Sequence, residues 1–241
     1  MVGKRQPFAT AYLIARGATR FNGSAMSIRQ IRVGTLQNFV YLLVDEPTGE
    51  AMVIDSGWDV DPIIVAARDE GLSVKYAVAT HHHSDHADTL SQLAQLLDAK
   101  VVACKGSPIP HDVSVAGNDV LEFGESKARI LHTPGHTEDS ICIFDGENLF
   151  TGDTLLIGGC GRTDLAGGSP KKMYRSLHSM IPALPPKTMV YPGHDYGEVP
   201  FRSLAYEKKL NPALLARSYA EFLRLPRRGF PGNDDALSSS H

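Results

Sequence analysis

Residues 80–86 read Thr-His-His-His-Ser-Asp-His, and this short stretch decides how the rest of the chain is interpreted. It contains four of the ten histidines of the protein. It follows residues 74–79, a mostly apolar run with two valines and a tyrosine that is typical of a strand, and it precedes residues 89–97, which are typical of a helix. The stretch is therefore predicted to be a loop at the end of a strand, where functional side chains often gather.

The residue types in this loop indicate metal binding. Neutral imidazole and carboxylate groups are suitable ligands for a divalent ion, at about 2.0–2.2 Å in the case of zinc. His81 and His83 are two residues apart on an extended segment, so they share one face and can grip one ion. Asp85 and His86 follow where the chain turns, and they can reach a second ion. His82 points to the opposite side and is expected to have a supporting role.

Three more residues of ligand type stand in Gly-containing loops that follow predicted strands. They are His136 in Pro-Gly-His-Thr, Asp153 in Thr-Gly-Asp and His194 in Pro-Gly-His-Asp. Loops of this kind at one end of a sheet scaffold can converge on one point, and Asp153 can then lie between two ions. The sequence therefore predicts a metal centre made of His81, His83, Asp85, His86, His136, Asp153 and His194.

Strands and helices alternate from about residue 30 to residue 223, with no repeat and no linker that would split the chain. Strand clusters separated by helices are typical of an α/β domain in which two mixed β-sheets are flanked by helices. The predicted strands are 31–33, 39–44, 51–54, 74–79, 101–104, 120–123, 129–131, 141–144, 148–150 and 189–191. The predicted helices begin at residues 61, 89, 170 and 211, and the last one forms a short C-terminal helical end to about residue 223.

The two ends of the chain are set apart from this domain. No Asp or Glu occurs before Asp45, and residues 1–25 are interpreted as an N-terminal extension of unknown role, which is also compatible with organelle targeting. Residues 226–241 are rich in Gly, Pro, Asp and Ser and are expected to form a flexible tail. The domain itself is predicted to span residues 26–225.

Composition and charge exclude several classes of protein. The 241 residues carry 27 acidic and 24 basic side chains, a net charge of −3, so no excess of positive charge is available for a nucleic acid backbone. No apolar run approaches the ~20 residues of a membrane helix. Three cysteines without a Cys-x-x-Cys pair provide neither a disulfide framework nor a four-cysteine zinc site. We therefore expect an intracellular, cytoplasmic protein.

The His-x-His-x-Asp-His pattern and the downstream Gly-His-Thr, Thr-Gly-Asp and Pro-Gly-His segments resemble the metallo-β-lactamase superfamily over roughly residues 30–212. The resemblance implies an αβ/βα sandwich with a metal site at one edge of the two sheets. It also implies that the seven residues named above are the metal ligands. Because this fold serves many reactions, the activity has to be inferred from further residues.

Three further segments are similar to the persulfide dioxygenases, which are mononuclear iron relatives of glyoxalase II that oxidise glutathione persulfide. They are Gly159-Cys-Gly-Arg-Thr-Asp164, Tyr191-Pro-Gly-His-Asp-Tyr196 and Glu207-Lys-Lys-Leu-Asn-Pro212. The resemblance implies one Fe(II) ion, held by two histidines and one carboxylate as in iron oxygenases, at His81, His136 and Asp153. The favoured function is therefore oxidation of a low-molecular-weight thiol persulfide by O₂ to sulfite and the thiol.

Other positions depart from the dioxygenase pattern and favour a hydrolase. His82 and Ser84 replace the Cys and Ala of that pattern. Asp55-Ser-Gly57 replaces Asp-Pro, and Glu138-Asp-Ser140 replaces Pro-Gly-Cys. Glyoxalase II carries the same seven ligands for two metal ions and hydrolyses a glutathione thioester. The alternative function is therefore a hydrolase with one or two Zn(II) ions that acts on glutathione thioesters or on related esters or lactones. A metal-binding scaffold without turnover is a third class, which the complete ligand set disfavours.

Four residues, Asp85, Arg162, Asp195 and Tyr196, are candidates for catalysis or substrate contact. Arg162 can hold a substrate carboxylate, or it can form a structural ion pair with Asp164 or Asp195. Asp195 is expected to orient a ligand histidine, and Tyr196 to donate to the substrate or to cover the site. The expected partner is a small thiol-derived molecule of glutathione type, with no nucleic acid and no membrane. A homodimer is compatible with the sequence.

Overall fold

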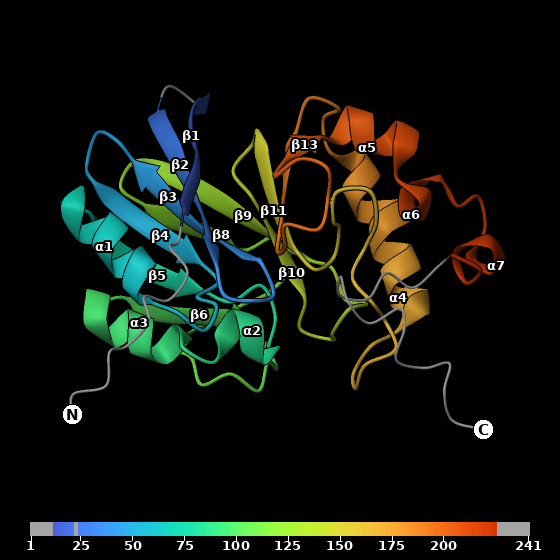
Figure 1. The fold of residues 1–241 in the computed structure, drawn as a ribbon, viewed down its shortest axis with the longest axis horizontal. Coiled ribbons are helices and arrows are strands. Elements are labelled where there is room, and N and C mark those ends of the chain that lie inside the picture. The colour runs from blue at the N-terminus through green and yellow to red at the C-terminus, as the bar shows by residue number, and fades with distance from the viewer. Residues whose placement is uncertain (1–11, 22–23, 226–241) are drawn as a thin grey trace, which may run out of the picture.

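A computed structural model describes residues 12–21 and 24–225 of the chain. Two β-sheets lie face to face in the middle of the molecule, and helices cover the outer face of each sheet (Figure 1). This arrangement confirms the predicted α/β class and the sandwich of two mixed sheets between helices. It also brings one end of both sheets together, and the loops at that end carry the histidine-rich segment.

The first sheet has seven strands in the order of the chain. Neighbours are antiparallel from β1 to β4 and parallel from β4 to β7. The strands are β1 (Tyr12–Phe21), β2 (Ser24–Val33), β3 (Asn38–Asp45), β4 (Glu50–Ile54), β5 (Ser73–Val78), β6 (Lys100–Cys104) and β7 (Val113–Val115). The helices of this half are α1 (Asp61–Asp69), α2 (Ser84–Ala87) and α3 (Leu90–Leu97).

The second sheet has six strands in the order β13-β12-β11-β10-β9-β8, and only β11 and β12 within it run parallel to each other. The strands are β8 (Val120–Phe123), β9 (Ser126–His132), β10 (Ile141–Phe144), β11 (Asn148–Gly152), β12 (Met189–Pro192) and β13 (Arg202–Ser203). The helices are α4 (Pro170–Arg175), the π-helix Ser176–Met180, the 3₁₀ turn Ile181–Ala183, α5 (Leu204–Leu210), α6 (Pro212–Leu215) and α7 (Tyr219–Phe222).

Strand periodicity explains why the sheets stack in this way. In β3, Tyr41 and Leu43 enter the core between the two sheets, whereas Val40 and Leu42 face α1 and α3. Because successive side chains of a strand point to opposite faces, a strand that is apolar at every position must be covered on both sides. β3 is buried at every position, so it sits between the second sheet and the helices.

Several elements differ from those predicted. β1 was not expected, and β2 begins at Ser24 rather than at residue 31; the two strands form a hairpin whose pairing runs from Phe21↔Ser24 to Tyr12↔Arg32. The single helix expected from 211 to 223 is wrong. It is two short helices, because Ala216 leaves helical geometry and Ser218 caps a new helix by accepting a hydrogen bond from the Glu221 amide.

Some of the expectations concern parts of the chain that the structure does not describe. The tail at 226–241 and the first eleven residues lie outside the described ranges. β1 lies within the segment 1–25 that was interpreted as an extension, and it pairs with β2. Across residues 12–21 and 24–225, none of the helices combines the length and the apolar character that crossing a membrane requires.

Candidate metal centre

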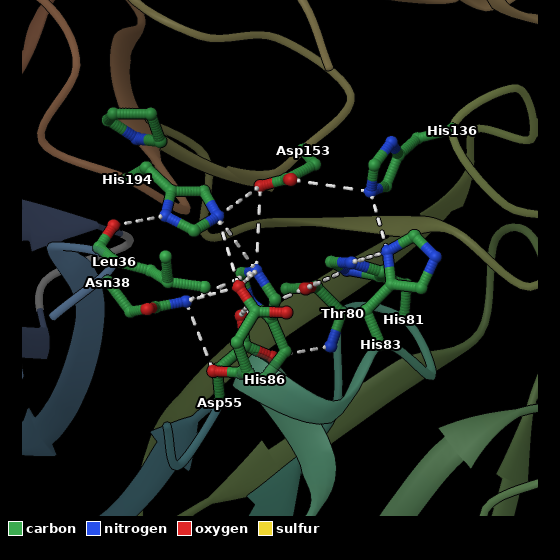
Figure 2. Close-up of polar contacts among 12 residues, drawn as sticks. Leu36, Asn38, Asp55, Thr80, His81, His83, His86, His136, Asp153 and His194 are labelled. Atoms are coloured by element: carbon green, nitrogen blue, oxygen red, sulfur yellow. Dashed lines mark hydrogen bonds and ion pairs between the residues drawn. The ribbon is translucent and has the colours of Figure 1, made fainter. Parts of the chain in front are cut away.

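The seven predicted ligands come together at the end of the two sheets, as Figure 2 shows for most of them. The loop after β5 carries His81 and His83, and α2 continues it with the next two ligands. The loops that follow β9, β11 and β12 supply the other three, from the opposite sheet. The full set is His81, His83, Asp85, His86, His136, Asp153 and His194.

Three histidines form the first half of the cluster. His81 Nε2 lies 3.1 Å from His83 Nδ1, and His83 Nδ1 lies 2.8 Å from His136 Nε2. The ring planes are nearly perpendicular, at 84° and 85°, and the close nitrogen atoms of the three rings meet at one place. Burial and the neighbouring His136 ring lower the pKa of His83 to about 4, so this side chain is neutral at pH 7 and can bind a metal.

The second half of the cluster consists of Asp85, His86 and His194. The two histidine Nε2 atoms face each other at 3.2 Å, and Asp85 Oδ2 lies 3.4 Å from each of them. Asn38 at the start of β3 donates from Nδ2 to Asp85 Oδ2 over 2.9 Å, which holds the carboxylate in place. The second group is therefore only slightly less compact than the first.

Asp153 stands between the two groups. Its Oδ2 lies 3.3 Å from His136 Nε2, and its Oδ1 lies 3.6 Å from His86 Nε2 and 3.4 Å from His194 Nε2. Oδ1 is buried, and no hydrogen bond to it comes from the described part of the chain. A buried carboxylate oxygen without a hydrogen bond is costly unless a cation neutralises it.

These distances fit a metal centre. Four ligands at about 2.0–2.1 Å from an ion are about 3.3 Å apart from each other in tetrahedral geometry. The facing nitrogens and oxygens of the cluster have separations of 2.8–3.6 Å. Imidazole and carboxylate are also the donors that iron, zinc and manganese accept. The residues therefore fit one or two divalent ions, with Asp153 within reach of both positions.

Backbone carbonyls fix the orientation of two of the histidines. His136 donates from Nδ1 to the carbonyl of Arg162 over 2.7 Å, and His194 donates from Nδ1 to the carbonyl of Leu36 over 2.9 Å. A carbonyl can only accept, so each Nδ1 carries the proton and each Nε2 offers its lone pair to the cluster. The pattern of residue types contains no signal for these contacts, because any residue has a carbonyl.

Asp55 orients the other side of the cluster, although its sequence motif indicated only a likeness to hydrolases. It is buried, accepts from His86 Nδ1 over 2.8 Å, and accepts from both the amide and the hydroxyl of Thr80. Because that hydroxyl donates to Asp55, it must accept from His81 Nδ1, which lies 3.1 Å away. Asp55 thus fixes His81 and His86 together. Its place directly after β4 was the signal that could have identified it.

The charge on His86 follows from this environment. Burial alone would lower its pKa, but the carboxylates of Asp55 and Asp153 outweigh burial and raise the pKa to about 10. The buried His81 shows the opposite effect, since burial and the neighbouring His86 hold its pKa well below the usual value. His86 in the metal-free cluster therefore carries a second proton and a positive charge. This second proton has to leave when a metal binds.

His82 points away from the cluster, as expected for the middle residue of His-x-His. Its Nδ1 contacts Asp139 Oδ1 at 2.7 Å, and Ser107 and Thr137 donate to the same carboxylate. Burial acts to raise the pKa of Asp139, but these hydrogen bonds outweigh it and the pKa is lowered. Asp139 therefore ties the histidine-rich loop to the loop that carries His136.

The remaining candidate residues lie around the cluster. Arg162 makes two hydrogen bonds to Asp164, at 2.8 and 3.0 Å, so its side chain forms the structural ion pair that was one of its two expected roles. Asp195 pairs with Arg32 at 3.1 Å. Its expected role in orienting a ligand histidine is corrected, because Leu36 holds His194 instead. The ring of Tyr196 covers His194, with centroids 4.6 Å apart and planes at 9°.

A pocket of about 280 Å³ opens above the cluster. Its floor is formed by the ligand residues, and its walls contain apolar side chains from several loops. The lining consists of Leu36, Trp58, His83, Ser84, Asp85, His136, Asp153, Leu156, Gly161, Arg162, Leu165, His194 and Tyr196. The pocket can therefore bring a small molecule with an apolar part directly to the candidate metal ligands.

Residues 33–194 match the model of the family described as the metallo-beta-lactamase superfamily. The chain is 35% identical over 208 residues to the Homo sapiens protein named persulfide dioxygenase ETHE1, mitochondrial, covering 85% of this chain and 82% of that protein. It is 39% identical over 164 residues to a hydroxyacylglutathione hydrolase of Pelagibacter ubique, covering 66% and 67%. The crystal structure of ETHE1 from Myxococcus xanthus superposes with a TM-score of 0.78 at 36% identity, covering 83% and 92%.

Proposed function

Because the chain belongs to the metallo-beta-lactamase superfamily, we propose that it is a metal-dependent persulfide dioxygenase. In this reaction a low-molecular-weight thiol persulfide, such as glutathione persulfide, reacts with O₂ and water to give sulfite, the thiol and two protons. The outer sulfur is oxidised and receives both atoms of O₂. Water supplies the third sulfite oxygen, and the sulfur–sulfur bond breaks so that the inner sulfur leaves as the thiol.

The main observation that supports this proposal is the position of the segment Gly159–Asp164. Its sequence is one of the three segments that are similar to the persulfide dioxygenases, and two of its residues line the pocket beside the candidate ligands. Gly161 lies so close that a Cβ there would be 3.0 Å from His136 Nδ1. The likeness to the human persulfide dioxygenase supports the same activity.

His81, His136 and Asp153 are the residues that we propose to hold an Fe(II) ion. All three are buried or lie at the floor of the pocket, and two imidazoles with one carboxylate leave open positions on such an ion. When bound, iron supplies the redox chemistry with O₂ that no side chain provides. The protein's own contribution is to place these ligands and to hold the substrate against them.

The pocket walls have separate roles in this proposal. Trp58, Leu165 and Tyr196 form apolar walls that limit the access of water to the reacting sulfur. Arg162 lies in the same wall, and it can bind a carboxylate of a glutathione-type thiol by exchanging Asp164 for it. Asp85 faces the pocket as well, and we assign to its carboxylate the acceptance of the proton that the persulfide loses.

A thioester hydrolase is the second candidate, and the completeness of the second group of ligands favours it. Asp85, His86 and His194 are nearly as close to one another as the first three histidines are, and the hydroxyacylglutathione hydrolase of Pelagibacter ubique is a relative. Two Zn(II) ions, when bound, lower the pKa of a water molecule toward ~7 so that it can attack a carbonyl. In this case the substrate is a glutathione thioester or a related ester or lactone.

Metal analysis and oxygen uptake on the same sample test the two candidates. The protein is purified without oxygen, its metal content is measured, and O₂ consumption is followed with glutathione persulfide. One iron per chain and O₂ uptake that depends on persulfide, with sulfite as product, are the expected results. Two zinc ions per chain, no O₂ uptake and release of thiol from S-lactoylglutathione would refute the dioxygenase and support the hydrolase.

Matched histidine variants connect the activity to the site. His136→Ala removes a candidate ligand and is expected to abolish both iron binding and O₂ uptake. His111→Ala changes a histidine whose side chain contacts Ser114 at the surface, so it leaves both unchanged. If His136→Ala retained iron and O₂ uptake, the proposed site would be wrong even if the activity were present.

A further inference from the structure

One loop both supplies a candidate ligand and orients another. It begins at Asp153 and reaches Arg162, whose carbonyl accepts the hydrogen bond from His136 Nδ1 at 2.7 Å. Its two ends are joined, because Gly161 donates from its amide to the Asp153 carbonyl over 2.9 Å. Gly161 also lies in close contact with both Asp153 and His136. A displacement of this loop would therefore move two of the three proposed iron ligands at once.

The far end of the same loop is held by two buried side chains of the C-terminal helical region. Asn211 Nδ2 lies 3.1 Å from the Leu156 carbonyl and 3.0 Å from the Gly159 carbonyl. Glu207 Oε2 accepts from the Gly158 amide at 2.9 Å and from Asn211 Nδ2 at 2.8 Å. Leu156 and Gly159 also exchange backbone hydrogen bonds, at 3.0 and 3.1 Å, so the tip is a closed turn with both side chains seated against it.

The Glu207 side chain is costly to keep in this position. Glu207 and Asn211 are fully buried, with exposed fractions of 0%. Glu207 Oε1 has no hydrogen bond within the described residues, and its nearest cation is Arg202 Nη1 at 3.7 Å. Burying a carboxylate with one oxygen that lacks a hydrogen bond disfavours folding, so the contacts of the other oxygen have to offset this cost. The contacts of these two residues are made to the loop of Asp153 and Arg162.

We propose that Glu207 and Asn211 are positioning residues of the candidate metal centre. They hold the tip of the loop 153–162, so that the Arg162 carbonyl keeps the Nδ1–H of His136 and the Nε2 lone pair stays directed at the metal position. Neither side chain touches the substrate pocket. The role concerns metal binding only, so it stands whether the enzyme is a dioxygenase or a hydrolase.

Cobalt(II) is a suitable probe, because its affinity and its visible absorption report on ligand geometry without any enzymatic turnover. Asn211→Asp is the main variant. An Asp at this position can still accept from the Ala213 amide and cap α6, but it cannot donate to the two carbonyls and it sets a second carboxylate beside Glu207. Asn211→Ser also keeps a capping side chain and serves if the Asp variant does not fold.

Two further variants separate positioning from general destabilisation. Glu207→Gln retains an oxygen that can accept from Gly158 and Asn211, so it is expected to keep the loop in its position. Asn148→Asp is the matched control, because Asn148 is also a buried asparagine that donates to a carboxylate, that of Asp145 at 2.8 Å, at the opposite end of β11 from Asp153.

Loss of outer contacts to a ligand histidine typically lowers metal affinity 10- to 100-fold. We expect Asn211→Asp or Asn211→Ser to lower cobalt affinity by that factor and to change the absorption spectrum. Glu207→Gln and Asn148→Asp should stay within threefold of the unchanged protein, even if Asn148→Asp melts at a lower temperature. The proposal is overturned if the Asn211 variants bind cobalt within threefold of the unchanged protein, or if Asn148→Asp loses as much affinity as they do.

Discussion

At the scale of single residues, the candidate metal centre depends on which nitrogen of each imidazole faces the cluster. His136 and His194 have their Nδ1 protons held by carbonyls, and His86 has its Nδ1 held by Asp55. Each of these contacts leaves Nε2 free of a proton in the metal-bound protein. His83 is the exception, since it turns Nδ1 toward the cluster. Small changes around these rings should therefore affect metal affinity before they affect the fold.

Gly161→Ala tests how little space there is beside His136. A Cβ at this position would lie 2.2 Å from the Asp153 carbonyl oxygen, and backbone atoms cannot give way easily. We expect at least a ~10-fold loss of zinc affinity, measured by competition with a chelator. Gly117→Ala is the control, because its nearest contact would be an ordinary 3.4 Å to His132 Cβ. Equal affinities of the two variants would contradict this reading of the site.

The raised pKa of His86 predicts proton release on metal binding. Because its pKa is about 10, His86 is protonated in the metal-free protein at pH 8, whereas a metal ligand must be neutral. Zinc binding at pH 8 should therefore release about one proton from this residue, and the release should disappear as the pH rises above 10. Calorimetry in two buffers of different ionisation enthalpy measures it.

Asp55→Asn tests whether the released proton comes from His86. Removing the carboxylate takes away the largest influence that raises the pKa of His86, so less protonated histidine is present before zinc binds. The variant should release fewer protons at pH 8 than the unchanged protein. Equal release from the two proteins would show that the proton comes from another source, such as bound water.

At the scale of elements, the ligands are placed by strands that end at the same edge of the molecule. β5 leads into the histidine-rich loop, while β9, β11 and β12 lead to ligands from the opposite sheet. β3 joins the two sides, because Asn38 contacts Asp85 and Phe39 donates its amide to the Gly193 carbonyl. The candidate metal centre therefore depends on the correct position of the first sheet. A buried ion pair between β2 and the end of α1 helps to fix that position.

Arg29 in β2 makes this ion pair with Glu70. Its guanidinium is nearly buried and makes hydrogen bonds of 2.6–3.0 Å to Glu70 at the end of α1. Arg29→Ala should lower the free energy of unfolding by about 2–3 kcal/mol, because it leaves Glu70 without this cation. Urea denaturation measures the change.

Arg32 on the same strand is the matched control. It pairs with Asp195, but its side chain is 40% exposed, so Arg32→Ala should cost about 1 kcal/mol or less. A larger loss from Arg32→Ala than from Arg29→Ala would mean that burial does not decide the strength of these pairs.

At the scale of the whole molecule, the candidate metal centre is assembled from both halves of the sandwich. His81 to His86 belong to the first sheet and its helices, whereas His136, Asp153 and His194 come from the second. An ion held by both groups stabilises the folded state only, because the unfolded chain does not assemble the site. Stability should therefore depend on the metal across the whole domain.

Removal of the metal tests this connection. A ligand present at 1,000 times its dissociation constant stabilises the folded protein by about 4 kcal/mol, so a chelator should lower the melting temperature by several degrees. Return of iron or zinc should restore it. His136→Ala should melt at nearly the same temperature with and without the chelator. An unchanged melting temperature after verified metal removal would show that the ion does not link the two sheets.

The sequence by itself determined which residues are candidate metal ligands, and in which loops they stand. His81, His136 and Asp153 were identifiable because imidazole and carboxylate groups are chemically distinctive, and because β-branched strands and Gly-containing loops are local patterns. The two-sheet α/β architecture followed from the same local periodicity and from the family resemblance. β1 was not predicted, because it is defined by its pairing with β2 and not by an apolar run in its own sequence.

Only the tertiary structure decided what orients those ligands. Leu36 holds His194 from 158 residues away, Asp55 reaches His86, and Asp195 turns to Arg32 instead of to a histidine. The hydrogen bonds from Glu207 and Asn211 to the turn 156–159 likewise join residues that are far apart in the sequence. The physical reason is that residue chemistry and periodicity are local properties, whereas a contact between distant carbonyls, carboxylates and rings exists only after two sheets have stacked in one register.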